Sequence, residues 1–425
     1  MKNIFLILVF IFISIKSFAQ VVPGSFLIEN IVVHTANDVI ENAVVGVQGD
    51  SIVLVADARV IRLNKSVYER IIDGEGNHLY PGFIAMNSSI GLREIDAVRA
   101  TLDYAEVGKI NPHVRSLASF NTDSRIIPTV RSNGVLFVQA CPRAGLVAGS
   151  SSLFHLSGWN WEDAVVHVDD GMHLNWPTAP LKLNPSDTSK QDKTNGKDLQ
   201  ELHKLFSESR AYVFENPAKR NLRLEAMKPV IQGNSTLYLH VEKARDIQDA
   251  VWFAKQYDIK RICVVGGEES HLVIDVLKRN NISVVLPRVH RLPDLPDTGA
   301  EEIYSQAAIL SKAGILVALS YDGDMEAMGT RNLPFTAGTV AAYGLSNIEA
   351  MNLISLNPAK IMALDVKEGS IDVGKKASFF LAKGNCMDMR SGGAIRIWVD
   401  GKEISSDNEQ KQLNRKYLNK YGISE

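Results

Sequence analysis

Three polar side chains lie at or near the ends of apolar, strand-sized segments and are of types that move protons. His240 follows residues 237–239, Asp322 comes shortly after residues 317–319, and His173 lies in a shorter segment of the same kind. A histidine and a carboxylate can act together as an acid and base pair. These three residues are therefore the first candidates for catalysis.

Each of these residues also has an ordinary structural alternative. His173 and His240 can be core histidines that are hydrogen-bonded near a strand end. Asp322 can cap the following loop or pair with an arginine such as Arg331. The neighbouring Asp324 and Glu326 are expected to be solvated loop residues.

Basic side chains lie between the last two apolar segments of the central region and shortly after the last one. Guanidinium and imidazole groups bind carboxylates and other anions, so Arg288, His290 and Arg331 are predicted to contact the substrate. The alternative is that the arginines in this part of the chain pair with Asp294 and Asp297.

Residues 143–152 contain two glycines and three serines. They are predicted to form a loop between the second and third central strands. Successive backbone N–H groups in such a loop can hold an anion. No lysine follows in the P-loop pattern, so the segment does not indicate a nucleotide phosphate site.

The two ends of the mature chain are predicted to be β structure. Short apolar runs separated by turn residues occur before residue 80 and return after residue 365. These runs are residues 26–33, 43–48, 51–56, 71–74, 369–375, 377–381 and 395–399. We expect the two groups to pair into one small β-sandwich domain.

Between residues 81 and 364, strand-sized apolar runs alternate with helix-length amphipathic segments. The runs are residues 134–140, 152–156, 172–176, 237–241, 262–265, 284–286 and 316–319, and the helical segments are 247–257, 269–279, 301–313 and 347–354. This alternation predicts the α/β class and a (β/α)8 TIM-like barrel with parallel strands.

We expect an exposed insertion in the barrel. It consists of the polar residues 184–197 and a charged helical segment at 199–225, which is broken near Pro217.

The first 20 residues have the features of a secretory signal peptide. Lys2 precedes an apolar run at residues 4–15, and small residues favour cleavage after Ala19. The sequence therefore predicts a periplasmic or secreted protein whose mature part has no membrane span. The remaining chain divides into a small β domain at 21–80 and 365–405, a barrel at 81–364 and a tail at 406–425.

Charge and cysteine content limit the classes of partner. The formal net charge is −2 and neither sign forms a long block, which argues against nucleic acid as a partner and favours a small-molecule substrate. Homo-oligomer formation is left open. The three cysteines are widely spaced and odd in number, so we expect packed thiols and no disulfide framework.

Two groups of motifs resemble a known family. Residues 80–84, Tyr-Pro-Gly-Phe-Ile, follow Ile-Asp-Gly at 72–74 and resemble the connection between the small β domain and the first barrel strand in the amidohydrolase superfamily. A longer resemblance, to the C-terminal part of imidazolonepropionase-like members, covers Arg-Asn-Leu-Pro at 331–334, Ala-Ala-Tyr-Gly-Leu at 341–345, Asn-Pro-Ala-Lys at 357–360 and Gly-Lys-Lys-Ala at 374–377.

The resemblance implies a metal site at the C-terminal mouth of the barrel, where a divalent ion generates hydroxide and polarises the carbonyl. His240 and Asp322 match two of the family's ligand positions. Four other positions are altered and carry Asn87, Ser89, His173 and Gly267. What remains implies one divalent metal, zinc by preference, held by His173, His240 and Asp322 with a water, or no metal.

Three hypotheses follow from these residues. The first is an exported hydrolase that acts on C–N bonds of a cyclic amide or a small peptide-like substrate. The second is a catalytically silent relative that binds a small molecule or a partner. The third is an enzyme that needs no metal and uses Asp322 and His240 as an acid and base pair.

Overall fold

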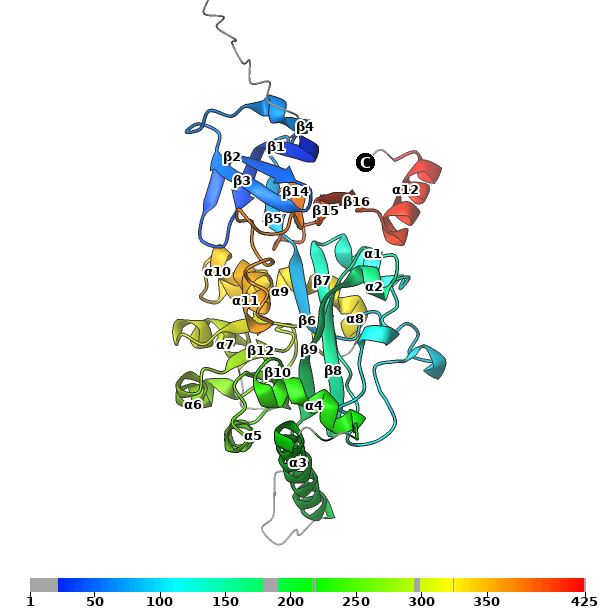
Figure 1. The fold of residues 1–425 in the computed structure, drawn as a ribbon. Helices are drawn as coiled ribbons and strands as arrows, with labels where there is room; N and C mark the ends of the chain where they lie inside the picture. Colours follow the sequence, from blue (N-terminus) through cyan, green and yellow to red (C-terminus); the bar gives the residue numbers. More distant parts are fainter. Residues whose placement is uncertain are drawn as a thin grey trace, which may run out of the picture.

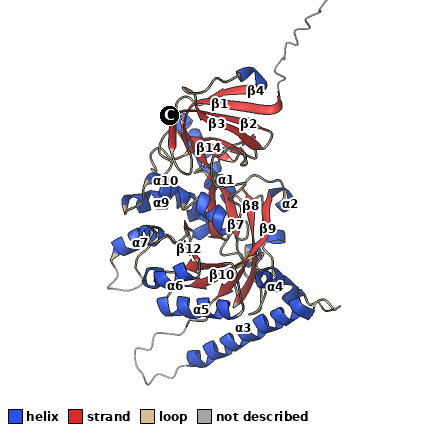
Figure 2. Cartoon of the chain, turned by 60° about the vertical axis from the view of Figure 1, so that its left-hand side comes forward, coloured by secondary structure: helices blue, strands red, loops and turns tan. Residues whose placement is uncertain are grey.

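The computed structural model describes residues 22–178, 190–215, 217, 219–293, 299–323 and 325–423. It contains two eight-stranded sheets, one in a small domain and one in a barrel (Figures 1 and 2). The predicted signal peptide lies outside the described residues. No helix within the described ranges is both long and apolar enough to cross a membrane.

The small domain combines strands from both ends of the chain, as predicted. Its strands are β1 (Val22–His34), β2 (Val39–Gln48), β3 (Ser51–Asp57), β4 (Tyr68–Asp73), β5 (His78–Pro81), β14 (Phe379–Ala382), β15 (Ala394–Val399) and β16 (Lys402–Ile404). Hydrogen bonds join them into one continuous sheet, in the order β16-β15-β14-β5-β1-β2-β3 with β4 beside β1. The two ends of the chain meet where β5 pairs antiparallel with β14.

Aromatic packing holds this junction together. Trp398 is fully buried, and its ring lies 6.1 Å from that of Phe26 and 5.5 Å from that of Phe379. These residues come from β15, β1 and β14, so one apolar cluster joins the N-terminal and C-terminal segments. Large buried rings contribute most to such cores.

The second sheet forms the barrel. Its strands, in spatial order, are β6 (Phe83–Ser88), β7 (Val135–Ala140), β8 (Val147–His155), β9 (Val165–Asn175), β10 (Thr236–Val241), β11 (Ile262–Gly266), β12 (Ser283–Leu286) and β13 (Val317–Leu319). A parallel bridge between Met86 and Ser320 links the first strand to the segment after the last. The predicted TIM-like barrel is confirmed.

One feature of the barrel differs from the prediction of an all-parallel sheet. Strand β8 is antiparallel to both β7 and β9. A parallel crossover needs a dozen or more residues, whereas few residues separate β8 from either neighbour. The alternating pattern of apolar runs does not reveal strand direction, so the short connections were the available signal.

The helices are α1 (Ile126–Arg131), α2 (Trp161–Ala164), α3 (Lys190–Glu215), α4 (Leu222–Gln232), α5 (Ala244–Gln256), α6 (Ile274–Arg279), α7 (Ala300–Lys312), α8 (Glu326–Gly329), α9 (Leu333–Ala342), α10 (Asn347–Asn352), α11 (Leu356–Ile361) and α12 (Glu409–Tyr421). Short 3-10 helices are η1 (Lys65–Val67), η2 (Arg99–Thr101), η3 (Leu117–Ser119), η4 (Ser270–Val273) and η5 (Thr330–Asn332). The expected helical segments are present, including the break between α3 and α4.

The residues expected to be a tail contain α12. Asn408, at the N-terminus of this helix, donates to Ser132 Oγ at 3.0 Å.

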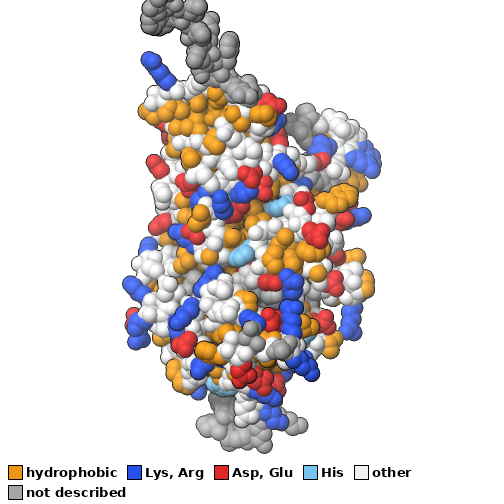
Figure 3. Space-filling model, in the orientation of Figure 1, with side chains coloured by type: hydrophobic (Ala, Val, Ile, Leu, Met, Phe, Trp, Pro, Cys, Tyr) orange, Lys and Arg blue, Asp and Glu red, His pale blue; other side chains and the backbone are white. Residues whose placement is uncertain are grey.

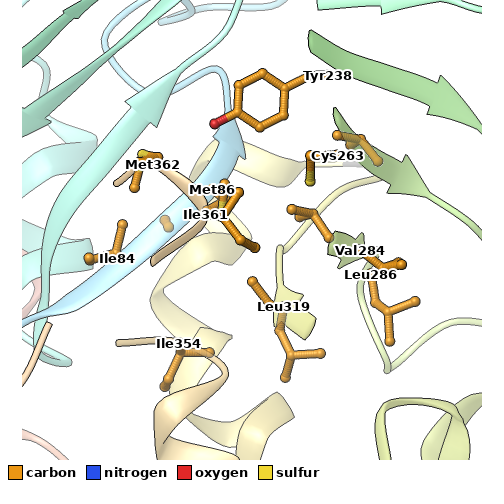
Figure 4. Packing of buried hydrophobic residues seen from close by; sticks show 14 of the residues in the cluster. Ile84, Met86, Tyr238, Cys263, Val284, Leu286, Leu319, Ile354, Ile361 and Met362 are labelled. Atoms are coloured by element: carbon orange, nitrogen blue, oxygen red, sulfur yellow. The ribbon is translucent and has the colours of Figure 1, made fainter. Parts of the chain in front are cut away.

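The barrel interior is closely packed, which leaves the mouth as the place for a site. Figure 4 shows apolar side chains from several strands converging, among them Met86, Val284 and Leu319.

All three cysteines are buried and form no disulfide, as predicted. On the face shown in Figure 3, positive and negative side chains are interspersed, in keeping with the small net charge.

Candidate active site at the mouth of the barrel

Two histidines on neighbouring strands meet near the C-terminal end of the barrel. The parallel pairing of β9 with β10 sets His173 opposite Tyr238 and Asn175 opposite His240. His173 Nδ1 and His240 Nε2 lie 2.8 Å apart, which is a hydrogen-bond distance. The structure therefore brings together two of the three residues predicted to carry chemistry.

Buried hydrogen bonds continue from the other nitrogen of His173. Its Nε2 lies 2.8 Å from Ser151 Oγ, and this hydroxyl donates to Asp170 Oδ1 at 2.7 Å. Asp170 is buried, and its second oxygen accepts from Gln139 Nε2 at 2.6 Å and from Tyr238 OH at 2.8 Å. Burial raises the pKa of Asp170 above its usual value, and these three hydrogen bonds oppose that rise by stabilising the charged form.

This chain of bonds determines which ring nitrogens carry hydrogen. Ser151 has one hydroxyl hydrogen, which goes to Asp170, so its oxygen accepts from His173 Nε2–H. His173 Nδ1 is then unprotonated and accepts from His240 Nε2–H. His240 Nδ1 consequently carries a lone pair and can accept a proton.

Both histidines are uncharged at neutral pH. Burial lowers the pKa of His173 well below its usual value, and the nearby His240 and Arg143 lower it further. Burial also lowers the pKa of His240 to about 4, and Arg143 adds to this effect while Asp322 opposes it. A neutral imidazole has a lone pair that can accept a proton, and the lowered pKa makes His240 a weaker base than a free histidine.

Asp322, just after β13, is held by two groups. Arg143 Nη1 donates to Asp322 Oδ1 at 3.3 Å, and Asn87 Nδ2 donates to Asp322 Oδ2 at 3.2 Å. Arg143 Nη2 also donates to the carbonyl oxygen of Asn87 at 2.5 Å. The side chain of Asp322 is 36% exposed, so this group opens to solvent. The arginine that pairs with Asp322 is Arg143, and not Arg331 as the structural alternative suggested.

Asn87 has an unusual backbone conformation. Its φ is 53°, in the left-handed region that residues with a side chain rarely adopt. The residue is buried, and its Oδ1 has no hydrogen-bond partner among the described residues. Backbone strain and unsatisfied buried polar atoms are concentrated at functional sites, so both observations mark Asn87.

Glu326, expected to be a solvated loop residue, is only 3% exposed. Its carboxylate accepts from Ser88 Oγ at 2.6 Å, from Ser89 N at 2.9 Å and from the Ser89 hydroxyl. Arg143 Nη2 lies 3.9 Å from Glu326 Oε2. The prediction was wrong because Glu326 packs against the end of β6, and Ser88 there lies 238 residues away in the sequence. Asp324 lies outside the described residues.

The segment 143–152 does not form the predicted anion-holding loop. From Val147 onward it belongs to β8, where Val147 N donates to Lys109 O at 3.1 Å and Ser150 N donates to Val114 O at 2.9 Å. Because these backbone donors are engaged, that prediction is wrong. This segment contributes two side chains to the site, those of Arg143 and Ser151.

Arg288 is the predicted substrate-binding residue that lies beside Asp322. Its guanidinium carbon lies over the Tyr321 ring, 5.5 Å from the centroid. A Cβ added to Gly323 would lie 3.5 Å from Arg288 Nη2. Arg288 therefore packs against the residues on either side of Asp322, at the rim of the site.

The other two predicted substrate-binding residues have partners of their own. His290 is exposed, and its Nε2 lies 2.6 Å from Thr339 Oγ1 on α9. Arg331 lies in η5, where its carbonyl oxygen accepts from Asn133 Nδ2 at 2.8 Å. Asp294 and Asp297, the alternative partners for arginines, lie outside the described residues.

Residues 212–404 match the model of the amidohydrolase family. This part of the chain belongs to the amidohydrolase family. The structure of this amidohydrolase is similar to that of an amidohydrolase from Thermotoga maritima MSB8, with a TM-score of 0.78 and 22% identity over 89% of this chain and 99% of that one. At this identity the structural likeness shows the fold, whereas the family match supports a hydrolase.

Two further solved structures share this fold. A prolidase complexed with N-methylphosphonate-L-proline has a TM-score of 0.55 and 15% identity, over 90% of this chain and 99% of that one. An adenosine deaminase from Xanthomonas campestris with bound zinc has a TM-score of 0.53 and 16% identity, over 93% and 98% of the two chains. No curated protein sequence matches this amidohydrolase.

Members of the superfamily typically depend on divalent metals, so the side chains at the mouth must be compared with a metal site. Both ring nitrogens of His173 are engaged, with His240 and with Ser151, while Asp322 pairs with Arg143. In the described part of the chain, no three His, Cys, Asp or Glu side chains gather to hold a metal. The residues of this amidohydrolase therefore do not fit the expected metal site.

Sequence reasoning found His240, His173 and Asp322 but missed the residues that hold them. Arg143 had a usable signal, because it lies shortly after the end of strand β7 and strand ends face the mouth. Ser151 and Asp170 had none, since each lies inside a strand that was predicted to be shorter or to lie elsewhere.

Proposed function

We propose that this amidohydrolase is a hydrolase of C–N bonds that acts on a cyclic amide or a small peptide-like substrate, as an imidazolonepropionase-like relative. The observation that carries the proposal is the base His240, which is fixed by the buried chain to Asp170 and lies near Arg143 and Asp322. A base of fixed tautomer next to a cation is what attack of water on a carbonyl requires.

In the proposed reaction, His240 Nδ1 removes a proton from water while the water oxygen forms a bond to the carbonyl carbon. Arg143 stabilises the developing oxyanion with N–H groups other than those on Asp322 and Asn87, because a guanidinium carries five donors. The C–N bond then breaks, and the leaving nitrogen takes the proton from His240. The imidazole returns to its starting form.

His173, Ser151 and Asp170 are positioning residues in this proposal. They do not reach the substrate, but they keep the hydrogen of His240 on Nε2 and its lone pair on Nδ1. Asp322 holds Arg143 in place and provides a negative charge beside the imidazolium that forms. An oriented base of this kind contributes roughly 10²- to 10⁴-fold to a rate.

The proposal is tested by assaying the mature protein against a panel of cyclic amides and dipeptides. His240→Ala should lower kcat/KM by about 100-fold or more on any substrate that the wild type hydrolyses. His113→Ala, which changes an exposed histidine elsewhere, serves as the control and should leave the rate unchanged. Equal rates for His240→Ala and the wild type would refute the proposal.

A second candidate function is a binding module without turnover. Asn87, Ser89 and Gly267 provide no histidine at three positions where the superfamily binds metal, which favours this alternative. It predicts that compounds from the same panel raise the midpoint of thermal unfolding while none is hydrolysed. The two functions therefore give different results in one screen.

We also propose that the protein is exported and that its partner is a small molecule. The basic start, apolar run and small residues before position 20 support export. Mass spectrometry of protein from the periplasmic fraction should give a chain that begins just after Ala19. A chain that retains residues 1–19 would contradict cleavage. Sedimentation of the same sample would test whether the protein is a homo-oligomer.

A further inference from the structure

We propose that the guanidinium of Arg143 is a permanent internal cation that takes the place of a divalent ion at the mouth of the barrel. Three oxygen atoms from separate segments surround it. Arg143 lies 2.5 Å from the Asn87 carbonyl oxygen, 3.3 Å from Asp322 Oδ1 and 3.9 Å from Glu326 Oε2. Carbonyl and carboxylate oxygens are the ligands of hard cations, and here they face a guanidinium.

The charges in this group are consistent with an internal cation. Asp322 and Glu326 contribute two carboxylates, and the positively charged Arg143 lies near both of them. An arginine stays charged throughout the accessible pH range, unlike lysine or histidine. A divalent ion at Asp322 would therefore meet a fixed positive charge at close range and be repelled.

The backbone around Arg143 is built to hold this cation. The main chain of Arg143 is fixed by its N–H to Tyr104 O at 2.8 Å and by Asn175 Nδ2 to its carbonyl oxygen at 3.0 Å. Asn87 adopts its left-handed conformation where its carbonyl oxygen meets the guanidinium. Such strain persists only where the surrounding structure compensates for it, which the bond to a cation does here.

Ser88, the last residue of β6, and Ser89, which follows it, complete the arrangement. Ser88 and Ser89 donate three hydrogen bonds to Glu326, which hold its side chain in place beside Arg143. Asn87 donates its amide to Asp322. The end of β6 therefore supports the two anions that balance Arg143, so its residues serve an arginine and not a metal ion.

The proposal is tested first by metal binding, a measurement that does not depend on whether the protein is a hydrolase. The mature wild-type protein is dialysed against EDTA, incubated with Zn²⁺ or Mn²⁺, passed through a desalting column and analysed by mass spectrometry. We expect fewer than about 0.1 ions per chain, and no change in the thermal midpoint with either ion or with EDTA. About one ion per chain, lost in Asp322→Ala, would overturn the proposal.

A second measurement uses Arg143→Ala, in which the three oxygen atoms lose their cation. Mn²⁺ or guanidinium at low millimolar concentration should raise the thermal midpoint of this variant by several degrees and should not raise that of the wild type. Arg245→Ala, which removes a highly exposed arginine, is the matched control and should not respond. If Arg143→Ala responds to neither cation, or if it responds only as Arg245→Ala does, the proposal is wrong. If the variant fails to fold, the metal measurement on the wild type decides.

Discussion

His173 Nδ1 lies 2.8 Å from His240 Nε2, and this bond makes the protonation of His240 depend on a carboxylate that His240 does not touch. Through His173 and Ser151 the chain ends at Asp170, on the same strand as His173. The chain fixes the tautomer of His240 and leaves its Nδ1 as the acceptor. The hydrogen bond that one ring nitrogen of a histidine makes commonly determines which nitrogen is free to react.

Ser151→Ala interrupts this chain. It leaves His173 Nε2–H without an acceptor and removes one donor from Asp170, so we expect a loss of about 1–3 kcal/mol in the free energy of unfolding. The tautomer of His240 is no longer fixed, so kcat should fall about tenfold with little change in KM. Urea unfolding and steady-state kinetics measure the two effects. Ser150→Ala, on the same strand, is the control, and an equal fall in kcat there would contradict the relay.

Asp322→Asn keeps the shape of the side chain and removes its charge. The variant should lose about 100-fold or more in kcat/KM, because Arg143 loses its nearest carboxylate and the imidazolium of His240 loses a negative neighbour. The side chain is 36% exposed, so the free energy of unfolding should change by no more than about 1 kcal/mol. Unchanged kinetics would exclude a catalytic role for Asp322.

Glu326→Gln tests the buried carboxylate. The neutral amide cannot accept all the hydrogen bonds from Ser88 and Ser89, and its NH₂ group faces donors. We expect a loss of about 2–4 kcal/mol in the free energy of unfolding, measured in urea. Glu301→Gln, on the exposed side of α7, should change it by less than about 0.5 kcal/mol. Similar losses in both variants would argue against the buried network.

Glu368 gives a pH dependence of stability. Burial raises the pKa of this carboxyl from 4.5 to about 8, with a contribution from Asp400. Because the folded state favours the protonated form, its stabilising contribution is complete below about pH 4.5 and is lost as the pH rises through 8. Glu368→Gln should therefore be more stable than the wild type at pH 9, by about 1 kcal/mol or more, and show little gain at pH 4.5.

Thermal unfolding across this pH range measures the difference between Glu368→Gln and the wild type. Glu409→Gln, at the exposed start of α12, is the control and should follow the wild type at every pH. A gain in Glu368→Gln that does not depend on pH would show that the buried carboxyl is not the titrating group.

The sequence predicted those features that depend on local pattern. His240 and Asp322 stand at or just beyond the ends of apolar runs, and strand ends of a barrel share one mouth, so their closeness followed from the fold. The pairing of β5 with β14 followed in the same way from two groups of β segments. The direction of β8 did not, because apolar runs look the same in parallel and antiparallel strands.

The partners of the candidate residues could not be predicted, because each comes from far along the chain. Arg143 and Asp322 are 179 residues apart, and Ser88 and Glu326 are 238 apart. No periodicity links such positions, and either charged residue alone is more often solvated than buried. The predicted metal ligands form hydrogen bonds and an ion pair with other side chains, so they do not fit the metal site that the family resemblance implied.

We infer that His240 and Arg143, and no metal ion, carry the chemistry at the mouth of the barrel. This inference is tested by measuring kcat/KM of the wild type on one hydrolysed substrate before and after dialysis against EDTA, beside His240→Ala. We expect an unchanged value after dialysis and a loss of about 100-fold or more in His240→Ala. Loss of wild-type activity in EDTA, with recovery when Zn²⁺ is returned, would contradict it.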